Sequence, residues 1–413
     1  MFKSFFPRPK LLLITTLVWV TLAVAIWYTV GEDFGARFGM PSADPNAPPV
    51  LGLGHFVTPD FLWFYIYCGA FLFVFSAAWF ILSPHPYQWW SITGTALILF
   101  STYYSVQVSV ALNNWRGPFF DDVQNALSGS GEVTAAQLYG LLLIFAKIAL
   151  MWVAVYVATR FFVSHYVFRW RQAMNDYYMS RWPEVRKIEG ASQRVQEDTM
   201  RFATIMEDLG VSVVDSLMTL FAFLPVLAAL SAHVSELPVV GSIAQPLLWA
   251  SVAWSAFGTL LLAIAGIKLP GLNFRNQRVE AAYRKELVYG EDDAARAEPM
   301  TVRELFGQVR KNYFRLYFHY AYFNIFRGLY LQTDNIFAYL ILIPTIAAGK
   351  ITFGILQQIL TAFGQVSGSF QYLVNSWSTI IELLSIRKRL VAFEAAFEGL
   401  PQADIEREHP LTP

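Results

Sequence analysis

The chain has 413 residues, of which 55% are apolar and only 15% are charged. Soluble domains usually carry about a quarter of charged residues, so a water-soluble protein of this length would lack the polar surface it needs. The 30 basic residues balance 30 acidic ones, and the zero net charge gives no electrostatic case for a nucleic-acid partner. The composition also excludes disordered, collagen-like and disulfide-rich classes, and it indicates a polytopic membrane protein.

Eight apolar stretches are long enough, at roughly 20 residues each, to cross about 30 Å of hydrocarbon. In chain order they lie at about 11–30, 61–82, 91–111, 137–163, 205–230, 247–269, 322–348 and 351–384. The first follows a basic start, as in a signal peptide, but its apolar run continues past Ala23-Val24-Ala25, which favours a retained span. We therefore expect an all-α protein with one transmembrane domain over residues 1–395 and a polar tail over residues 396–413.

Basic residues are distributed unevenly between the two sides of these spans. The segments 164–204 and 270–321 are rich in Lys and Arg, whereas the loops on the other side hold only Arg37, Arg116 and Lys350. Loops that stay in the cytoplasm carry an excess of Lys and Arg. This asymmetry predicts that both termini and both basic segments lie in the cytoplasm.

The two basic segments are also low in Gly and Pro, and polar residues recur in them at helical spacing. In the first segment, Gln193, Glu197 and Arg201 follow one another at four-residue intervals. We therefore expect the fifth and sixth spans to continue as helices well beyond the membrane, with breaks at Pro183 and Pro270.

Acidic residues in the fifth span are the first functional candidates, because ionisable groups inside a membrane are costly and usually functional. The span begins with Glu207 and Asp208 and continues to Asp215. Carboxylates along a polar cavity can carry protons, because burial and like-charge neighbours raise a carboxyl pKa towards the working pH. The alternative is that Glu207 and Asp208 lie at the membrane interface, solvated or paired with Arg201. The pattern alone does not choose between Glu207 and Asp208.

Further carboxylates extend this group. Glu197 and Asp208 are eleven residues apart and share one helical face, and Glu280 and Glu291 share a face in the second basic segment. Asp334 lies deeper, within the seventh span, where we favour a cavity-facing role.

The last span carries a stripe of small and polar residues at intervals of seven. In a bilayer such a stripe faces a water-filled cavity or a packed neighbouring helix rather than lipid. Its length and its Gln side chains favour cavity lining over helix packing, and both interpretations stay open. The candidate cavity-lining residues are Gln358, Thr361, Gln365, Asn375 and Glu382.

No motif for catalysis or cofactor binding is present in the sequence. The Gly349-Lys350 pair is followed by Ile351 and lacks the upstream Gly of a phosphate-binding loop. The six His are scattered, and neither a metal-binding cluster nor a nucleophile elbow occurs. Cys68, the one cysteine, cannot form a disulfide within the chain. We therefore expect a protein that is not an enzyme and that needs no metal or other cofactor.

Several long segments resemble one family. The stretches at 161–182, 189–203, 268–294 and 309–325, the opening MFKSFFP and the run at 363–377 are similar to those of the SbmA/BacA family of bacterial peptide transporters. The resemblance implies an inner-membrane homodimer that imports antimicrobial, Pro-rich and modified peptides with the proton gradient. It also implies a fold similar to the transmembrane half of ABC exporters, without the ATPase.

The family is associated with a ladder of glutamates that lines its cavity. Matched by motif, the ladder falls on Glu197 in VQED, Glu207 in MEDLG, Glu280 in RVEAA and Glu291 in YGEDD. The resemblance also implies four further transport-associated positions. These are Trp182, Gln193, Asp198 and Arg389.

Two other functions remain open from the sequence. One is a permease subunit that works with a separate ATPase chain on lipid or fatty-acyl substrates. Peroxisome-type fatty-acyl ABC transporters share a related cytoplasmic segment. The segment that opens Asn-Pro-Asp-Gln in those transporters reads Gly190-Ala191-Ser192-Gln193 here, which weakens the lipid hypothesis. The other is an envelope assembly protein that moves no solute.

Overall fold

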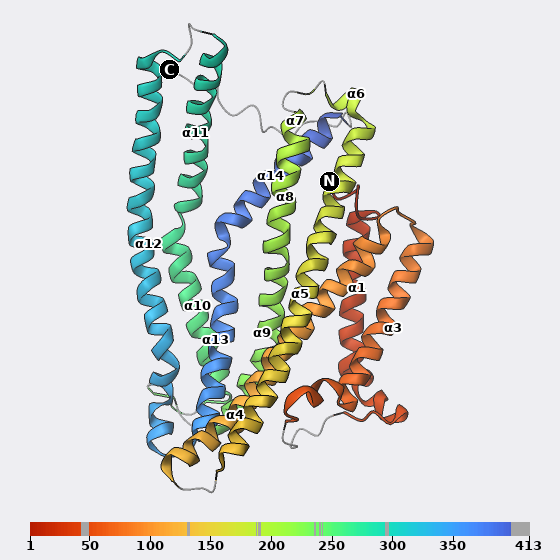
Figure 1. Cartoon of the computed structure of the whole chain (residues 1–413), viewed down its shortest axis with the longest axis vertical. Coiled ribbons are helices and arrows are strands. Elements are labelled where there is room, and N and C mark those ends of the chain that lie inside the picture. Colours follow the sequence, from red (N-terminus) through yellow and green to blue (C-terminus); the bar gives the residue numbers. More distant parts are fainter. Residues whose placement is uncertain are drawn as a thin grey trace. The chain divides into compact units, whose positions relative to one another are not determined.

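A computed structural model describes residues 1–42, 49–129, 133–186, 188, 191–234, 237–238, 241, 243–293 and 297–397. Over these residues the protein is built from helices, with no β-strand, which confirms the all-α prediction (Figure 1). The polar tail predicted for residues 396–413 lies outside the described residues, except for its first two positions, which belong to the last helix.

The α-helices include long elements and single turns. They are α1 (Pro9–Ile26), α2 (Glu32–Phe34), α3 (Pro59–Leu82), α4 (Thr95–Ser128), α5 (Ala135–Ser180), α6 (Trp182–Val185), α7 (Ala191–Gln193), α8 (Thr199–Ile205), α9 (Val211–Leu230), α10 (Pro246–Gly266), α11 (Leu269–Asp292), α12 (Pro299–Ala347), α13 (Phe353–Asn375) and α14 (Trp377–Phe397). Four π-helical turns, η1 (Trp27–Gly31), η4 (Trp89–Gly94), η5 (Arg194–Asp198) and η6 (Met206–Gly210), adjoin them.

Seven helical segments of the described chain are long and apolar enough to cross a membrane. They coincide with the first seven predicted stretches and are Pro9–Phe38, Pro59–Leu82, Trp89–Ser128, Ala135–Ser180, Ala191–His233, Pro246–Asn273 and Pro299–Ala347. The eighth stretch, 351–384, is also helical but is not among the seven, because its Gln, Ser and Gly residues dilute its apolar character. It is also not one helix, since α13 ends at Asn375 and α14 begins at Trp377.

The helical segments of the fifth and sixth spans extend beyond their apolar stretches, as predicted. The fifth covers 43 residues, Ala191–His233, and the sixth is followed by the 24 residues of α11. The fourth span also extends, because its helix α5 is 46 residues long, or about 69 Å, roughly twice the thickness of the hydrocarbon. Breaks occur next to both predicted prolines: α6 begins with Trp182-Pro183, and α11 begins with Leu269-Pro270. Proline is favoured in the first turn of a helix, where its missing N–H costs nothing.

The chain divides into two compact units. The first comprises residues 1–222, 352–358 and the chain from Glu382 onwards. The second comprises Phe223–Ile351 and Ile359–Ile381. Helices α9, α13 and α14 each contain residues of both units.

The first unit has an aromatic core where the N-terminal segment meets α5 and α8. Phe5 is fully buried and stacks on Trp170, with 5.6 Å between the ring centroids, and Phe202 meets the same indole edge-on at 5.0 Å. Tyr178, near the end of α5, donates a 2.9 Å hydrogen bond to Glu394 of α14. Burial of these large rings anchors α5, α8 and α14 in one cluster.

The start of α13 is attached to α4 within the first unit. Asp121 and Gln124 of α4 accept hydrogen bonds from the backbone N–H groups of Gly354 and Phe353, at 2.7 and 2.9 Å. These N–H groups have no partner inside their own helix, and a carboxylate at a helix N-terminus also opposes the positive end of its dipole. Gly354 lies against the backbone of Gly117, so the two helices touch without intervening side chains.

The second unit contains the α11–α12 hairpin, whose two helices run side by side (Figure 1). The Asn312 side chain donates hydrogen bonds to the Leu272 carbonyl at 3.4 Å and to Asn276 at 3.1 Å. Asn273 donates to the Tyr320 hydroxyl at 3.1 Å. These amide contacts fix how the first turns of α11 lie against α12.

Candidate functional site

Two pairs of adjacent acidic residues lie in π-helical turns of the fifth candidate span. Glu197 and Asp198 end η5, and Glu207 and Asp208 lie in η6. A π-helical turn widens the helix by one residue and shifts the backbone hydrogen bonds from i→i+4 to i→i+5. Such turns are rare and recur at functional sites, so their coincidence with the acidic pairs marks this helix as the candidate site.

Asp198 is the most deeply buried of these carboxylates, with 3% of its side chain exposed. Arg389 of α14 binds it with two nitrogens, Nη2 at 2.7 Å and Nε at 3.1 Å, and Arg194 adds a third contact at 2.9 Å. Bidentate arginine pairs are among the strongest charge-assisted hydrogen bonds. The arrangement connects η5 to α14, and it joins Asp198 and Arg389, two of the positions that the family resemblance implied.

Glu197 lies in a more open cluster on the same helix. It accepts a hydrogen bond from Gln193 at 3.1 Å and forms an ion pair with Arg201 at 2.8 Å. The other terminal nitrogen of Arg201 lies 3.8 Å from Glu382 of α14. Arg201 therefore lies between two carboxylates, one on its own helical segment and one on α14.

Glu207 and Asp208 are adjacent but have different surroundings. Asp208 is 71% exposed and is paired with Arg160 at 3.3 Å. Glu207 is half-buried and accepts a 2.6 Å hydrogen bond from the Ser164 hydroxyl of α5. Among the ion pairs between described residues, none involves Glu207, so this carboxyl group is held by a neutral partner.

Several other predicted positions lie elsewhere in the structure. Trp182 is half-buried against the aromatic core of the first unit at the start of α6. Glu280 is half-buried within α11, and Glu291 is exposed one residue before the end of that helix. The first unit therefore brings together Glu197, Gln193, Asp198, Arg389 and Glu382, whereas Glu280 and Glu291 belong to the second.

The stripe on the last predicted span is divided by the break at Ser376. Gln358 donates a 3.1 Å hydrogen bond to the Asn113 carbonyl of α4 and covers Gly117, so this residue makes a helix-packing contact. Thr361 and Gln365 are half-buried and Asn375 is exposed. The stripe is therefore not the continuous helical surface that the spacing predicts, since Glu382 belongs to α14.

A polar network around Asp334 is the feature that the sequence did not reveal in full. In the second unit its carboxylate accepts hydrogen bonds from Trp254 of α10 at 2.8 Å and from Ser367 of α13 at 2.9 Å. Gln371 lies one turn after Ser367 and donates to it at 3.0 Å and to Asp334 at 3.4 Å. All three donors are neutral, and they come from two helices distant in sequence, which is why the sequence identified only Asp334.

The described residues contain no group of three or more His, Cys, Asp or Glu side chains placed to hold a metal ion. The described carboxyl groups of the two units fall into two kinds, those with arginine partners and those with neutral partners. Asp198 and Asp208 have arginine partners, whereas Glu207 and Asp334 are held by neutral donors.

Comparison with known proteins gives one family and several relatives. The model of the SbmA/BacA-like family matches residues 84–398. The chain is 26% identical over 319 residues to the inner membrane ABC transporter ATP-binding protein YddA of Escherichia coli (strain K12), covering 72% of this chain and 55% of that protein. It is 24% identical over 419 residues to an uncharacterised ABC transporter ATP-binding protein of Synechocystis, covering 94% and 58% respectively.

A plant relative is more distant. The ABC transporter D family member 2, chloroplastic, of Arabidopsis thaliana is 23% identical over 243 residues, which cover 55% of this chain and 33% of the relative. The chain thus spans little more than half the length of the first two relatives. Together with the helical fold, these matches fit the transmembrane domain of an ABC exporter.

Proposed function

The chain belongs to the SbmA/BacA-like family, whose model matches most of its length, and we propose that it imports peptides with the energy of a proton gradient. Its family, its relatives and its apolar helices make it a multi-pass membrane transporter. The proposal adds the substrate class, which is antimicrobial, Pro-rich and modified peptides. It also names the proton as the coupling ion. It also adds a homodimer in the bacterial inner membrane with both termini in the cytoplasm.

The observation that carries the proton coupling is the contact between Ser164 and Glu207. A serine hydroxyl can donate to an ionised carboxylate and accept from a protonated one, so Glu207 keeps a hydrogen bond in both states. The neighbouring Asp208 has Arg160 as its partner, and neutralising one member of an ion pair leaves the other charge without its counterion. Of these two adjacent carboxyl groups, Glu207 is therefore the one suited to take up and release a proton.

The cluster around Arg201 supplies a way to convert a charge change into movement. While Glu197 is ionised it holds Arg201 at 2.8 Å, and Glu382 is the more distant partner at 3.8 Å. Protonation of Glu197 releases the arginine towards Glu382 of α14. Exchange of the Arg201–Glu197 pair for an Arg201–Glu382 pair needs a free-energy difference of only a few kcal/mol between the two arrangements. One protonation event can shift a two-state equilibrium on that scale.

The decisive experiment measures uptake of a fluorescent Pro-rich peptide into proteoliposomes that contain the purified protein, with an imposed pH gradient. We expect uptake with the gradient and none after a protonophore collapses it. Glu207→Gln should reduce uptake at least about tenfold, as expected when a coupling group is removed, whereas the matched variant Asp208→Asn should retain it. Gradient-independent uptake, or equal uptake by Glu207→Gln and wild-type protein, would contradict the proposal.

The relatives favour a second candidate function. Their names describe ATP-binding proteins, and this chain spans little more than half of the first two, so a permease that works with a separate ATPase on lipid or fatty-acyl substrates is the alternative. That function predicts co-purification of a nucleotide-binding chain and uptake that requires ATP. An envelope assembly protein that moves no solute predicts no peptide flux in the same vesicles under either condition.

A further inference from the structure

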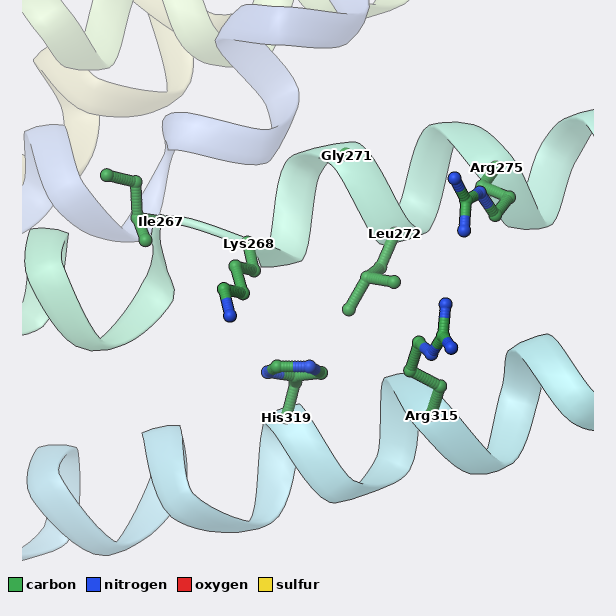
Figure 2. A pocket seen from close by; sticks show the side chains of 7 residues that line it. All are labelled: Ile267, Lys268, Gly271, Leu272, Arg275, Arg315 and His319. Carbon is green, nitrogen blue, oxygen red and sulfur yellow. The ribbon is translucent and has the colours of Figure 1, made fainter.

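A basic pocket of about 480 Å³ lies between the start of α11 and the facing side of α12. Lys268 and Arg275 reach it from the α11 side, and Arg315 and His319 reach it from α12. Figure 2 shows these four side chains pointing toward one another across the gap between the helices. The pocket belongs entirely to the second unit and is separate from the carboxylate clusters described above.

The positive charge in this pocket is not balanced by the described protein. No acidic residue lines the pocket, and no ion pair between described residues involves Lys268, Arg275 or Arg315. Three cations held around one cavity repel one another and create a positive potential that attracts an anion. The two guanidinium groups also offer forked donors, which match the oxygens of a phosphate better than a point charge does.

The backbone adds to this preference. α11 begins at Leu269 after Lys268, and no side chain caps its first turn, so the positive end of the helix dipole is close to the pocket. Gly271 lines the pocket, and a Cβ at this position would meet nothing within 4 Å. A ligand oxygen can therefore approach the first turn of α11 closely.

The surroundings of the pocket are apolar, which indicates an amphiphilic ligand. The candidate span that contains α10 ends at Asn273. Ile267, which lines the pocket, and Ile264, which precedes it, are both exposed. On α12, Phe314 and Phe318 are exposed beside Arg315 and His319. Cations next to exposed apolar and aromatic side chains are typical of the depth at which a helix leaves the membrane.

We propose that this pocket binds the phosphate of an anionic membrane phospholipid. The phosphate oxygens take hydrogen bonds from Arg275, Arg315 and Lys268, and the acyl chains lie along the exposed apolar surface at Ile264 and Ile267. His319 is oriented by a 2.6 Å hydrogen bond between its Nδ1 and the Tyr322 hydroxyl, which leaves Nε2 for the ligand. Basic pockets between transmembrane helices are established sites for such headgroups in general.

The test measures lipid binding by the full chain and does not depend on transport. Purified protein in a neutral detergent is titrated with phosphatidylglycerol or with phosphatidylcholine, and bound lipid is counted by native mass spectrometry. We expect phosphatidylglycerol to bind at least about tenfold more tightly, and Arg275→Gln or Arg315→Gln to weaken it about tenfold or more, the loss expected for one charge-assisted hydrogen bond. The matched control Arg310→Gln changes an exposed arginine on the same helix outside the pocket and should bind as wild type.

Three outcomes would overturn the proposal. Equal binding of the two lipids would show that the pocket does not select an anionic headgroup. An equal loss in Arg310→Gln would assign the effect to overall charge. Displacement of the lipid by millimolar inorganic phosphate, with phosphate binding that itself requires Arg275, would assign the site to soluble phosphate compounds. Circular dichroism of each variant shows whether its helices are retained.

Discussion

The hydroxyl of Ser164 lies 2.6 Å from the Glu207 carboxylate and joins α5 to the π-helical turn η6. The spacing of acidic residues alone could not separate Glu207 from Asp208, because adjacent carboxylates differ in the partners that the fold brings to them. The Arg160 contact of Asp208 supplies the distinction.

Ser164→Ala should lower peptide uptake without abolishing it. The substitution removes the 2.6 Å hydrogen bond that holds the Glu207 carboxyl group against α5. Because such a hydrogen bond contributes about 1 kcal/mol, we expect the uptake rate to fall by up to about fivefold. Uptake rates in proteoliposomes under the same pH gradient measure the loss. Ser164→Thr keeps the hydroxyl and should retain the wild-type rate; an unchanged rate in Ser164→Ala would remove Ser164 from the coupling scheme.

Asp198→Asn should destabilise the protein rather than alter its coupling. The substitution leaves Arg194 and Arg389 without their buried partner, and we expect a loss of roughly 1.5–3 kcal/mol, the worth of hydrogen bonds to a charged group. The measurement is the apparent melting temperature in detergent. The control, Asp208→Asn, changes an exposed carboxylate and should leave the melting temperature nearly unchanged. Equal effects of the two substitutions would contradict the structural role assigned to the Arg389 contact.

Gly354→Ala should separate α13 from α4. A Cβ at this position would overlap the carbonyl oxygen of Gly117, and a backbone atom cannot rotate away as a side chain can. We expect a loss of roughly 1–3 kcal/mol, as for other overpacked contacts, and a lower melting temperature. A Cβ added at Gly364 of the same helix would meet nothing within 4 Å. Gly364→Ala should therefore leave the free energy of unfolding unchanged or raise it by up to about 1 kcal/mol through helix propensity. A stable Gly354→Ala protein would show that the two helices are not in backbone contact.

His85 should make the protein less stable at mildly acidic pH. Burial lowers the pKa of His85 below its usual 6.5, although its hydrogen bond with the Lys3 backbone acts in the opposite direction. The unfolded chain then binds a proton that the folded chain resists, so stability falls as the pH drops through about 6.5 and levels off below the lowered pKa. The difference in melting temperature between pH 7.5 and pH 5.5 should be smaller in His85→Gln than in the wild-type protein. An equal difference in both would assign the acid sensitivity to other groups.

The sequence predicted the features that depend on local chain properties. The first seven apolar runs coincide with long helices because length and hydropathy are read directly from consecutive residues. The breaks near Pro183 and Pro270 were predictable because proline cannot occupy a helix interior without loss of a hydrogen bond. The charge asymmetry and the family motifs then directed attention to the acidic pairs of the fifth span.

Other features depend on contacts that a single sequence does not show. The π-helical turns at Glu197 and Glu207 arise from a one-residue shift in backbone hydrogen bonding. The amino-acid composition of such a turn does not distinguish it from the surrounding α-helix. The break at Ser376 contains neither Gly nor Pro, so residues 351–384 gave the pattern of one helix. The partners of Asp334 lie 80 and 33 residues away at Trp254 and Ser367, and only the packing of three helices brings them together.

The unbroken length of α12 has a mechanical consequence. This single helix of 49 residues carries Arg315 and His319 of the basic pocket and, about 22 Å further along its axis, Asp334 of the polar network. A displacement of α12 at the pocket would therefore be transmitted along the helix to the contacts of Asp334 with Trp254 and Ser367. Under the proposed lipid binding, this helix would connect the composition of the bilayer to the Asp334 network of the second unit.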